Sequence, residues 1–460
     1  MAKKKEKTLE EKLQEALVPE NQWPYILPEN WCWTYVEFIA DKIKRGKSPK
    51  YVEKSLFPVF AQKCNQKDGT IALEKARFLN PDMVSKISDD VFLREDDIVI
   101  NSTGTGTLGR VGFIRKKDML GYKQILPDSH VTTVRGVFCV NKLYLYMFLK
   151  MKQAYLELQG SGSTNQKELR PDSIGTIKFP LPPLLEQKRI VHRIESLFAK
   201  LDEAKEKIQQ VLDGAEMRKA AILHKAFTGE LTKNWRKENG ISEDSWESVK
   251  LKELGEFNRG KSKHRPRNDP RLFNGPYPFI QTGDVSSSGM YIQKHSQTLS
   301  EFGMQQSRLF PKDTLCITIA ANIGKVAILT YDCCFPDSVV GFTPNERTFS
   351  KYMYYSMLKI QKEIEALAPA VAQKNLSLKL LLDVNVQIPS VEEQHTIVKI
   401  IERLLKHEKN VISSSMRSIE SIETMKKSIL AKAFRGELGT NNPTEDSALN
   451  LLKEVLQDKS

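Results

Sequence analysis

The sequence of 460 residues predicts an α+β fold in which two similar mixed α/β domains are each followed by a long helix. Three observations predict it: an internal repeat, a heptad spacing of apolar residues, and short runs typical of strands. PPLLEQKRIVHRIESLF from Pro182 matches PSVEEQHTIVKIIERLL from Pro389, at a shift of about 207 residues. AAILHKAFTGEL, ending at Leu231, matches KSILAKAFRGEL, ending at Leu438, at the same shift. The chain therefore arose by internal duplication.

The duplication extends into the two domains, where the matches are shorter but keep their order. The motif RGKS occurs at Arg45–Ser48 and again at Arg259–Ser262. The other matched pairs are DIVIN from Asp97 with DTLCI from Asp313, PDS at Pro127–Ser129 with PDS at Pro336–Ser338, and Gln166-Lys167 with Gln373-Lys374. Runs such as RVGFI and KVAIL are typical of strands, and the stretches from Lys142 and Ser350 are typical of helices. Each half therefore carries one mixed α/β domain.

The matched segments themselves read as long helices, because their apolar residues recur at alternating steps of four and three. Each would run about 40 residues, or roughly 60 Å. The seam of the first helix is Ile190, Ile194, Leu197, Leu201, Ala204, Ile208, Val211 and Ala215, and that of the second is Ile397, Ile401, Leu404, Val411, Ile419, Ile422, Met425 and Ile429. Gly214 and Arg218 weaken the first seam, and Glu408 and Ser415 interrupt the second. The alternative is two separate amphipathic helices, each packed on its own domain.

These patterns divide the chain into six segments. They are an N-terminal helical segment at 1–22, a first domain at 23–181, a central long helix with its linker at 182–240, a second domain at 241–388, a second long helix at 389–438, and a C-terminal segment at 439–460. Prolines precede both long helices and GEL ends both, as helix start and stop signals should.

The bulk composition favours a basic protein of the cytoplasm. The net charge is +13, which suits a polyanionic partner, although a basic soluble protein without such a partner has the same charge. No apolar run approaches the ~20 residues that span a bilayer, and no apolar stretch of a secretory signal follows the charged start. The six cysteines show no CxxC spacing, so we expect reduced thiols and no metal site.

Two glycine motifs suggest nucleotide binding, and their surroundings argue against it. GEFNRGKS, Gly255–Ser262, has the spacing of a phosphate-binding P-loop, but Pro266 and Pro270 oppose the helix that must follow. GTGTLG, Gly104–Gly109, has the spacing of a dinucleotide fingerprint, but the next residues read as a strand. The Asn/Asp-Pro-Pro-Tyr/Phe loop of adenine methyltransferases is absent, and no catalytic constellation emerges. We therefore expect no chemistry from this chain.

The two matched segments, PLPPLLEQKRIVHRIESLFAKLDE with AILHKAFTGEL and EEQHTIVKIIERLL with ILAKAFRGEL, resemble the two conserved regions of the specificity subunit of Type I restriction–modification systems. The terminal segments are also similar to that family's ends, so the resemblance covers nearly the whole chain. It implies that the two domains are target-recognition domains, each reading one half of a split DNA sequence. It also implies that the long helices form an antiparallel coiled coil with pseudo-twofold symmetry, which spaces the domains and docks other subunits.

The partners that the resemblance implies are double-stranded DNA, two methyltransferase (modification) subunits and the restriction/translocase subunits. No membrane partner is expected. S-adenosylmethionine, ATP and Mg²⁺ would be bound by the partner subunits, and no cofactor is expected in this chain. Because the two domains have diverged, their half-sites should differ, so the target should be asymmetric and bipartite. The register and length of the helices would set the gap between the half-sites.

The candidate DNA contacts are basic and polar loop residues. RGKSKHRPRNDPR, Arg259–Arg271, carries six basic residues and one acid, which fits phosphate contact or guanine recognition but equally a solvated loop. The candidates are Arg45, Lys47, Asn101, Thr103, Thr105, Arg110, Gln166, Lys167, Arg259, Lys261, Lys263, Arg265, Arg267, Gln281, Thr282, Gln373 and Lys374. Of these, Gln166, Lys167, Gln373 and Lys374 either meet DNA or cap and orient the long helices. We also expected Ser102 to be free to meet a ligand.

Two other functions stay open at this point. A coiled-coil adaptor would join proteins without binding DNA, so its isolated domains would ignore duplex DNA even at low salt. An ATP-driven enzyme built on Gly255–Ser262 would bind ATP and would lose activity on replacement of Lys261.

Overall fold

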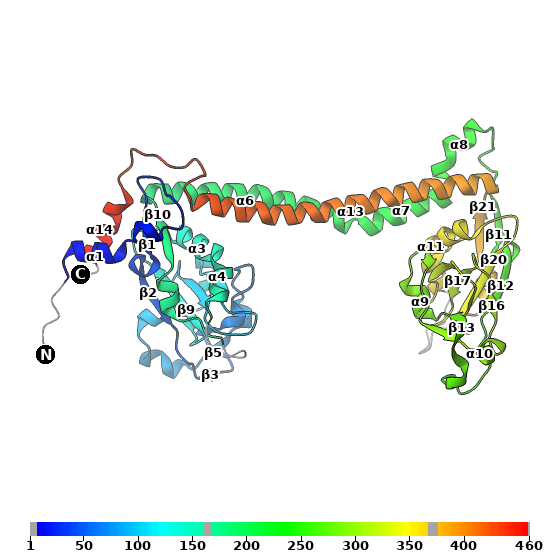
Figure 1. Cartoon of the computed structure of the whole chain (residues 1–460), viewed down its shortest axis with the longest axis horizontal. Coiled ribbons are helices and arrows are strands. Elements are labelled where there is room, and N and C mark those ends of the chain that lie inside the picture. Colours follow the sequence, from blue (N-terminus) through cyan, green and yellow to red (C-terminus); the bar gives the residue numbers. More distant parts are fainter. Residues whose placement is uncertain (1–6, 161–166, 367–375, 459–460) are drawn as a thin grey trace. The chain divides into compact units, whose positions relative to one another are not determined.

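The computed structural model describes residues 7–160, 167–366 and 376–458. It forms two compact units, one made of residues 1–207 and 418–460 and the other of residues 208–417 (Figure 1). Each unit contains one mixed α/β domain and parts of both long helices. No helix in the described ranges is both long and apolar enough to span a bilayer.

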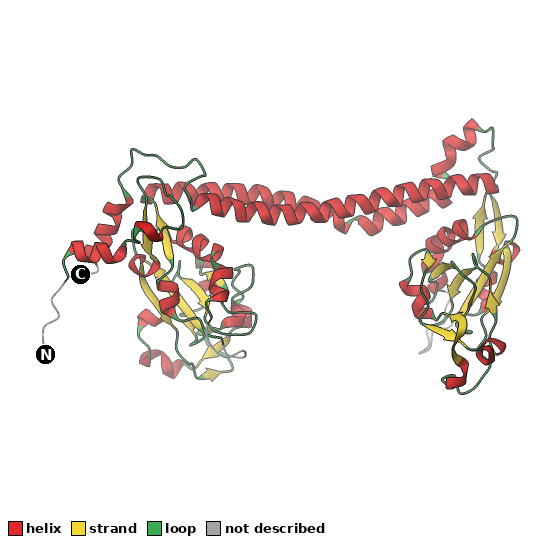
Figure 2. Ribbon diagram, in the orientation of Figure 1, coloured by secondary structure: helices red, strands yellow, loops and turns green. Residues whose placement is uncertain are grey.

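The first unit contains ten strands in three small sheets. The strands are β1 (Cys32–Tyr35), β2 (Ala40–Arg45), β3 (Tyr51–Val52), β4 (Pro58–Phe60), β5 (Arg77–Leu79), β6 (Ile98–Asn101), β7 (Val111–Phe113), β8 (Leu126–Pro127), β9 (Val131–Gly136) and β10 (Lys178–Leu181). Its helices are α1 (Leu9–Ala16), α2 (Lys116–Met119), α3 (Lys142–Met151), α4 (Gln153–Leu158), α5 (Pro171–Gly175), most of α6 (Leu184–Asp213) and α14 (Ala448–Asp458). Figure 2 shows how helices and strands mix within this domain. The N-terminal helix α1 packs against the C-terminal helix α14.

The second unit repeats this plan with one additional strand. Its strands are β11 (Glu247–Lys250), β12 (Gly255–Arg259), β13 (Phe273–Phe279), β14 (Tyr291–Ile292), β15 (Gln297–Leu299), β16 (Leu309–Phe310), β17 (Leu315–Thr318), β18 (Val326–Leu329), β19 (Cys333–Cys334), β20 (Val339–Pro344) and β21 (Asn385–Ile388). Its helices are α7 (Ala215–Phe227), α8 (Lys233–Glu238), α9 (Thr282–Ser287), α10 (Glu301–Gln305), α11 (Ser350–Ala366), α12 (Leu378–Leu382) and the first part of α13 (Val391–Ala433).

The sheets confirm that the two domains are repeats of one fold. One sheet has the order β2-β9-β6-β7 in the first domain and β12-β20-β17-β18-β14 in the second, so four strands correspond and β14 is added at the edge. A second sheet contains one parallel pair in each domain, β4 with β8 and β13 with β19. A third, two-stranded sheet joins the start of each domain to its end, as β1-β10 and β11-β21.

The strand register corrects the sequence match by one residue. In the first domain Asn101 pairs with Val131, and the corresponding pair in the second domain is Thr318 with Val339. Asp313 therefore corresponds to Asp96 and not to Asp97, and both aspartates have a positive φ, 69° and 65°. The PDS motifs are likewise offset by one residue. A one-residue slip escapes notice in buried strands, where consecutive residues are all apolar.

The long helices pair antiparallel within each unit. In the first unit, Asp202 and Lys205 of α6 form ion pairs with Lys426 and Glu423 of α13, so residue numbers rise on one helix as they fall on the other. Among the predicted seam residues, Ile190, Ile194, Ile397, Ile401 and Ile422 are buried, and Leu197, Leu201, Ile208, Leu404 and Val411 are half-buried. This burial fits a coiled-coil seam, and the assignment of the individual seam residues stays a prediction.

The alternative, that each helix packs on its own domain, also holds for the first turns of each helix. Ile190 and Ile194 belong to the core of the first domain, and Ile397 and Ile401 to that of the second.

Two details of the helix prediction are wrong. The second long helix, α13, is continuous over 43 residues, but the first is divided into α6 and α7 at Gly214. Near this break Val211 is 40% exposed while its neighbour Leu212 is half-buried, so the seam shifts by one residue. Met425, also placed in the seam, is 52% exposed. The division of the chain into six segments remains a prediction.

A buried Glu-Gln pair fixes the start of each long helix on its domain. Gln187 donates to the carbonyl of Pro182 at 2.9 Å, and Gln394 donates to the carbonyl of Pro389 at 3.0 Å. The preceding residue, Glu186 or Glu393, accepts a hydrogen bond from a tryptophan indole in both halves. The repeated Glu-Gln dipeptide therefore attaches the first turn of each long helix to its domain.

Candidate nucleic-acid interface

The RGKS motif forms the same turn in both domains. β2 ends at Arg45, after which Gly46 N–H donates to the Val131 carbonyl and Lys47 N–H to the Pro127 carbonyl, both at 3.0 Å. In the second domain, Gly260 N–H donates to Val339 at 3.0 Å and Lys261 N–H to Phe335 at 3.1 Å. A Cβ on Gly46 would overlap the carbonyls of Pro127 and Asp128, and a Cβ on Gly260 would overlap those of Phe335 and Pro336. The motif is therefore a tight packing turn that presents a lysine.

The secondary structure around the two glycine motifs decides whether either of them can bind a nucleotide. Gly255 to Arg259 form strand β12 itself, and no helix occurs in the described residues from Gly260 to Asp269, so a P-loop does not form. Gly104–Gly109 is followed by strand β7, which confirms that this loop joins two strands and is not a dinucleotide fingerprint.

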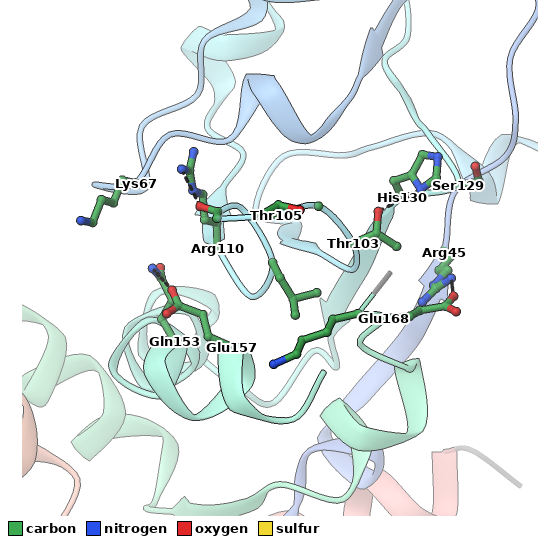
Figure 3. Close-up of a pocket in the computed structure, with 14 residues that line it drawn as sticks. Arg45, Lys67, Thr103, Thr105, Arg110, Ser129, His130, Gln153, Glu157 and Glu168 are labelled. Atoms are coloured by element: carbon green, nitrogen blue, oxygen red, sulfur yellow. Dashed lines mark hydrogen bonds and ion pairs between the residues drawn. The ribbon is translucent and has the colours of Figure 1, made fainter. Parts of the chain in front are cut away.

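A hollow of about 1000 Å³ in the first domain brings together five of the candidate residues (Figure 3). They are Arg45, Thr103, Thr105, Arg110 and Lys167. The hollow also contains residues that the sequence analysis missed, namely Lys67, Ser129, His130, Gln153, Glu157 and Glu168. Four Lys or Arg side chains and two carboxylates line it, so its formal charge is positive.

Local contacts orient several of these side chains. Arg45 forms an ion pair with Glu168 and donates to the Leu169 carbonyl at 2.8 Å, which ties the RGKS turn to the segment before α5. Arg110 donates to the Gly106 carbonyl at 2.9 Å and so holds the loop that carries Thr105. These two arginines line the hollow and are held in place by the protein.

His130 reaches the hollow together with Thr103. Thr103 Oγ1 lies 2.9 Å from His130 Nδ1, and Gln62 Nε2 also donates to this hydroxyl. Figure 3 shows Gln153 and Glu157 side by side on α4, one turn apart, on the opposite wall. The hollow therefore offers hydroxyl, imidazole, amide and carboxylate groups, which are the groups that read base edges in DNA.

The prediction for Asn101 is wrong. Its side chain is fully buried, donates to the Gln62 carbonyl at 3.1 Å, and accepts from Asn65 Nδ2 at 3.2 Å. Ser102, which we also expected to be free, is buried and bonded to Thr132 Oγ1 at 2.6 Å. The strand β6 extends past its apolar residues to Asn101, and the buried side chains of Asn101 and Ser102 form hydrogen bonds at its end.

A second hollow, of about 580 Å³, adjoins the RGKS turn of the second domain, but the β17–β18 loop, which corresponds to the loop of Gly104–Gly109, does not line it. Of the candidate residues it contains Lys261, Arg267 and Gln281. Its other polar residues are Ser262, His264, Asn268, Gln297, Gln306, Ser307 and Ser338, and its apolar wall includes Phe273 and Phe279. Gln281 Nε2 donates to Gln297 Oε1 at 2.9 Å. This lining is rich in side-chain amides, unlike that of the first hollow.

The basic loop around the second hollow carries less free charge than its sequence suggests. Arg267 lies 3.2 Å from Asp337, and Arg271 lies 2.7 Å from Asp269, whose pKa is held well below its usual range by hydrogen bonds from Arg271. Arg259 donates to the Asp337 carbonyl.

In the basic loop Arg259–Arg271, no carboxylate pairs with Lys261, Lys263 or Arg265 among the described residues, and Arg259 is bound by the Asp337 carbonyl alone. Arg265 donates only to the carbonyls of Ser262 and His264. These three side chains are available to an external anion.

The remaining candidates lie outside the two hollows. Lys47 and Lys263 are exposed beside them, Arg259 ends strand β12, Arg265 lies on the loop that follows, and Thr282 lies on α9. Thr282 is half-buried as the first residue of α9. Gln166, Gln373 and Lys374 lie outside the described residues. Lys67 and His130 had no strong sequence signal, whereas Gln153 and Glu157 have the i, i+4 spacing of one helix face.

Comparisons with known proteins agree with this architecture. The family model described as Type I restriction modification DNA specificity domain matches twice, at residues 42–213 and 243–414. The EcoBI specificity subunit of Escherichia coli is 26% identical over 351 residues, which cover 70% of this chain and 72% of the relative. The MjaVIII specificity subunit of Methanocaldococcus jannaschii is 27% identical over 439 residues, which cover 90% of this chain and 95% of the relative.

A solved structure supports the fold. The HsdS subunit from Thermoanaerobacter tengcongensis superposes with a TM-score of 0.62 at 17% identity and covers 91% of this chain and 100% of that one. The two matches of the family model coincide with the two repeated halves of the sequence and cover most of the chain. The chain therefore belongs to the family of Type I restriction modification DNA specificity domains.

Proposed function

We propose that the chain is the DNA-specificity subunit of a Type I restriction–modification complex and that each hollow reads one half of a split target. The observation that carries this proposal is that each of the two repeated domains has a polar hollow bordered by its RGKS turn. Cations beside a polar hollow suit DNA, because phosphate contacts position a protein while polar side chains read base edges.

The two hollows are unlike, which supports an asymmetric target. The first presents threonine, histidine, arginine and glutamate, and the second presents mainly glutamine, asparagine and serine. Different donor and acceptor sets select different bases, so the two half-sites would differ in sequence.

We further propose that two methyltransferase subunits and the restriction/translocase subunits dock on this chain and perform the chemistry. S-adenosylmethionine, ATP and Mg²⁺ would be bound by these partners. The assembly would act in the cytoplasm, which suits a chain whose six cysteines are all unpaired. The coiled-coil adaptor is the competing function, and DNA binding separates the two.

Replacing Lys261, Lys263 and Arg265 with alanine should weaken DNA binding and flatten its salt dependence. Each lost phosphate contact lowers the slope of log affinity against log salt by about 0.9. The measurement is a titration of the full chain with a duplex that carries the motif methylated in the host, at several salt concentrations. Lys116, Lys117 and Lys123, which line neither hollow, provide a control triple variant with the same loss of charge.

The outcomes distinguish the assignments. If both triple variants bind as the unmodified chain does, the loop around the second hollow makes no phosphate contact. If the unmodified chain itself ignores duplex DNA even at low salt, the adaptor function is correct and the proposal fails.

Replacing Gly260 with alanine should displace the RGKS turn of the second domain. The added Cβ would overlap the carbonyl oxygens of Phe335 and Pro336, and such overpacking costs about 1–3 kcal/mol. We expect a lower unfolding temperature and weaker DNA binding. Gly283→Ala is the matched control, because its Cβ would meet no atom within 4 Å. Equal behaviour of the two variants would contradict the role of the turn.

A further inference from the structure

An ion pair occupies the seam between the two long helices in the second unit. Arg218 Nε of α7 donates to both carboxylate oxygens of Glu408 on α13, at 3.1 and 3.0 Å. The Glu408 side chain is only 16% exposed, and Arg218 is half-buried. Arg218 and Glu408 each interrupt the apolar pattern of one helix, and they pair with each other across the seam.

The first long helix is adapted to hold this arginine. Arg218 Nη2 donates to the carbonyl of Val211 at 2.9 Å, and a Cβ on Gly214 would lie 2.8 Å from Arg218 Nη1. Gly214 thus leaves the space that the guanidinium fills. The break between α6 and α7 and the shift of the seam from Val211 to Leu212 fall at this same place.

The duplication shows that this pair is present only once. The repeat equates Arg218 with Met425 and Glu408 with Leu201. Asp202 and Lys426, the next residues along, form an ion pair in the first unit, so Leu201 and Met425 lie at one level of the helix pair. Leu201 and Met425 are both apolar, whereas their repeat counterparts, Glu408 and Arg218, carry opposite charges. The polar level is therefore specific to one register of two unlike helices.

A change of register would separate the two charges. If the helices slid by one heptad, Arg218 would face Ile401 or Ser415, and Glu408 would face Val211 or Lys225. The first alternative leaves a half-buried guanidinium against an apolar residue. A polar residue at a single seam position is known to specify the register of coiled coils at some cost in stability. Apart from the uncharged Ser415, the other predicted seam positions are apolar, so between the residues packed in the domain cores this ion pair distinguishes one register from another.

We propose that Arg218 and Glu408 fix the register of the two helices and thereby determine the gap that the chain accepts between its two half-sites. This inference rests on the proposed DNA-recognition function. Arg218 and Glu408 are positioning residues, because they act on DNA only through the helices that carry the domains.

The test uses the full chain and a series of duplexes in which both half-sites are kept and the gap between them is changed by single base pairs. In the variant R218L/E408L both charges are replaced by apolar residues, which helix pairs tolerate well. We expect its preference for the native gap over neighbouring gaps to fall by about tenfold or more, with both half-sites still required. The control variant K205L/E423L removes a more exposed ion pair of the same helices and should keep the native preference.

A second measurement reports the register without DNA. Cysteines introduced as K205C and E423C face each other across the helix pair and should be joined efficiently by a short bifunctional reagent. In R218L/E408L we expect reduced joining of this pair and new joining of K205C to cysteines placed seven residues from position 423. An unchanged gap preference together with an unchanged cross-linking pattern would overturn the inference. Failure of the unmodified chain to bind DNA would instead overturn the proposed function, and the cross-linking would still decide the register.

Discussion

Replacing Arg236 with alanine should destabilise the second unit by about 3–5 kcal/mol, the usual cost of removing one partner of a buried ion pair. Arg236 Nη1 lies 2.6 Å from Glu393 Oε1, and the two side chains are only 7% and 1% exposed. The arginine also donates to the Gly229 carbonyl at 2.8 Å, where the first long helix ends. Its loss would leave the Glu393 carboxylate buried with hydrogen bonds from Thr232 and Trp246 alone.

The measurement is denaturant unfolding followed by tryptophan fluorescence, together with hydrogen exchange of peptides near Val391. Trp246 donates to Glu393 and therefore reports directly on this cluster. Arg189→Ala is the matched control, because Arg189 pairs with Glu445 at 2.6 Å but is 39% exposed, so its loss should cost about 1 kcal/mol or less. A loss for Arg236→Ala no greater than that of the control would show that Glu393 is stabilised without its cation.

The two repeats stabilise the buried glutamate at the start of their long helices with different partners. Glu186, the counterpart of Glu393, accepts hydrogen bonds from Trp31 and Asn441, both at 2.8 Å, and within the described residues it forms no ion pair with an arginine, although Arg189 lies near enough to lower its pKa. Burial raises the pKa of Glu186, which the hydrogen bonds from Trp31 and Asn441 partly oppose. The partner Asn441 comes from the C-terminal segment, whereas Arg236 comes from the linker after the first long helix. A residue of the C-terminal segment therefore stabilises the buried glutamate of the first domain, and a residue of the linker stabilises that of the second.

Much of this fold could be predicted from the sequence because periodicity and repetition are local properties of the letters. The heptad spacing located α13 and the repeat located two similar domains. The break at Gly214 could not be predicted, because a glycine inside a helix is often tolerated. In the sequence of its own helix, each of Arg218 and Glu408 appears only as a charged residue at a position where the heptad pattern expects an apolar one. Their pairing depends on which residues meet across two helices, and the spacing on a single helix does not contain that information.

Part of the candidate site was predictable because a loop between two strands presents polar residues, and another part because the RGKS motif is repeated. Thr103, Thr105 and Arg110 line the first hollow for the first of these reasons. Asn101 does not, because the Asn65 amide from a distant turn reaches its side chain and buries it at the end of β6. His130 also reaches the hollow by a tertiary contact, with Thr103. Neither contact has a signature in the neighbouring sequence.

Replacing Phe434 with alanine should destabilise the first unit by about 3–5 kcal/mol, the cost of removing a fully buried aromatic ring. Phe434 directly follows α13 and is fully buried, with its ring centroid 5.0 Å from that of Tyr144 and 5.2 Å from that of Phe148. Its repeat, Phe227, lies 5.4 Å from Tyr352 in the second domain. The letters KAF near the end of each long helix therefore anchor that helix on a domain core.

The anchoring can be separated from general effects on the helix by a variant on the same element. Met425→Ala removes a side chain of α13 that is 52% exposed, so its cost should stay within about 0.5 kcal/mol. Denaturant unfolding followed by the fluorescence of Trp31 and Trp33 measures both variants, since these residues are buried in the first unit. If Phe434→Ala were as mild as Met425→Ala, the C-terminal end of α13 would not be held by the aromatic cluster. If it is as costly as expected, hydrogen exchange should increase at the end of α13 before it increases in the β2-β9-β6-β7 sheet, because the lost contacts belong to the helix end.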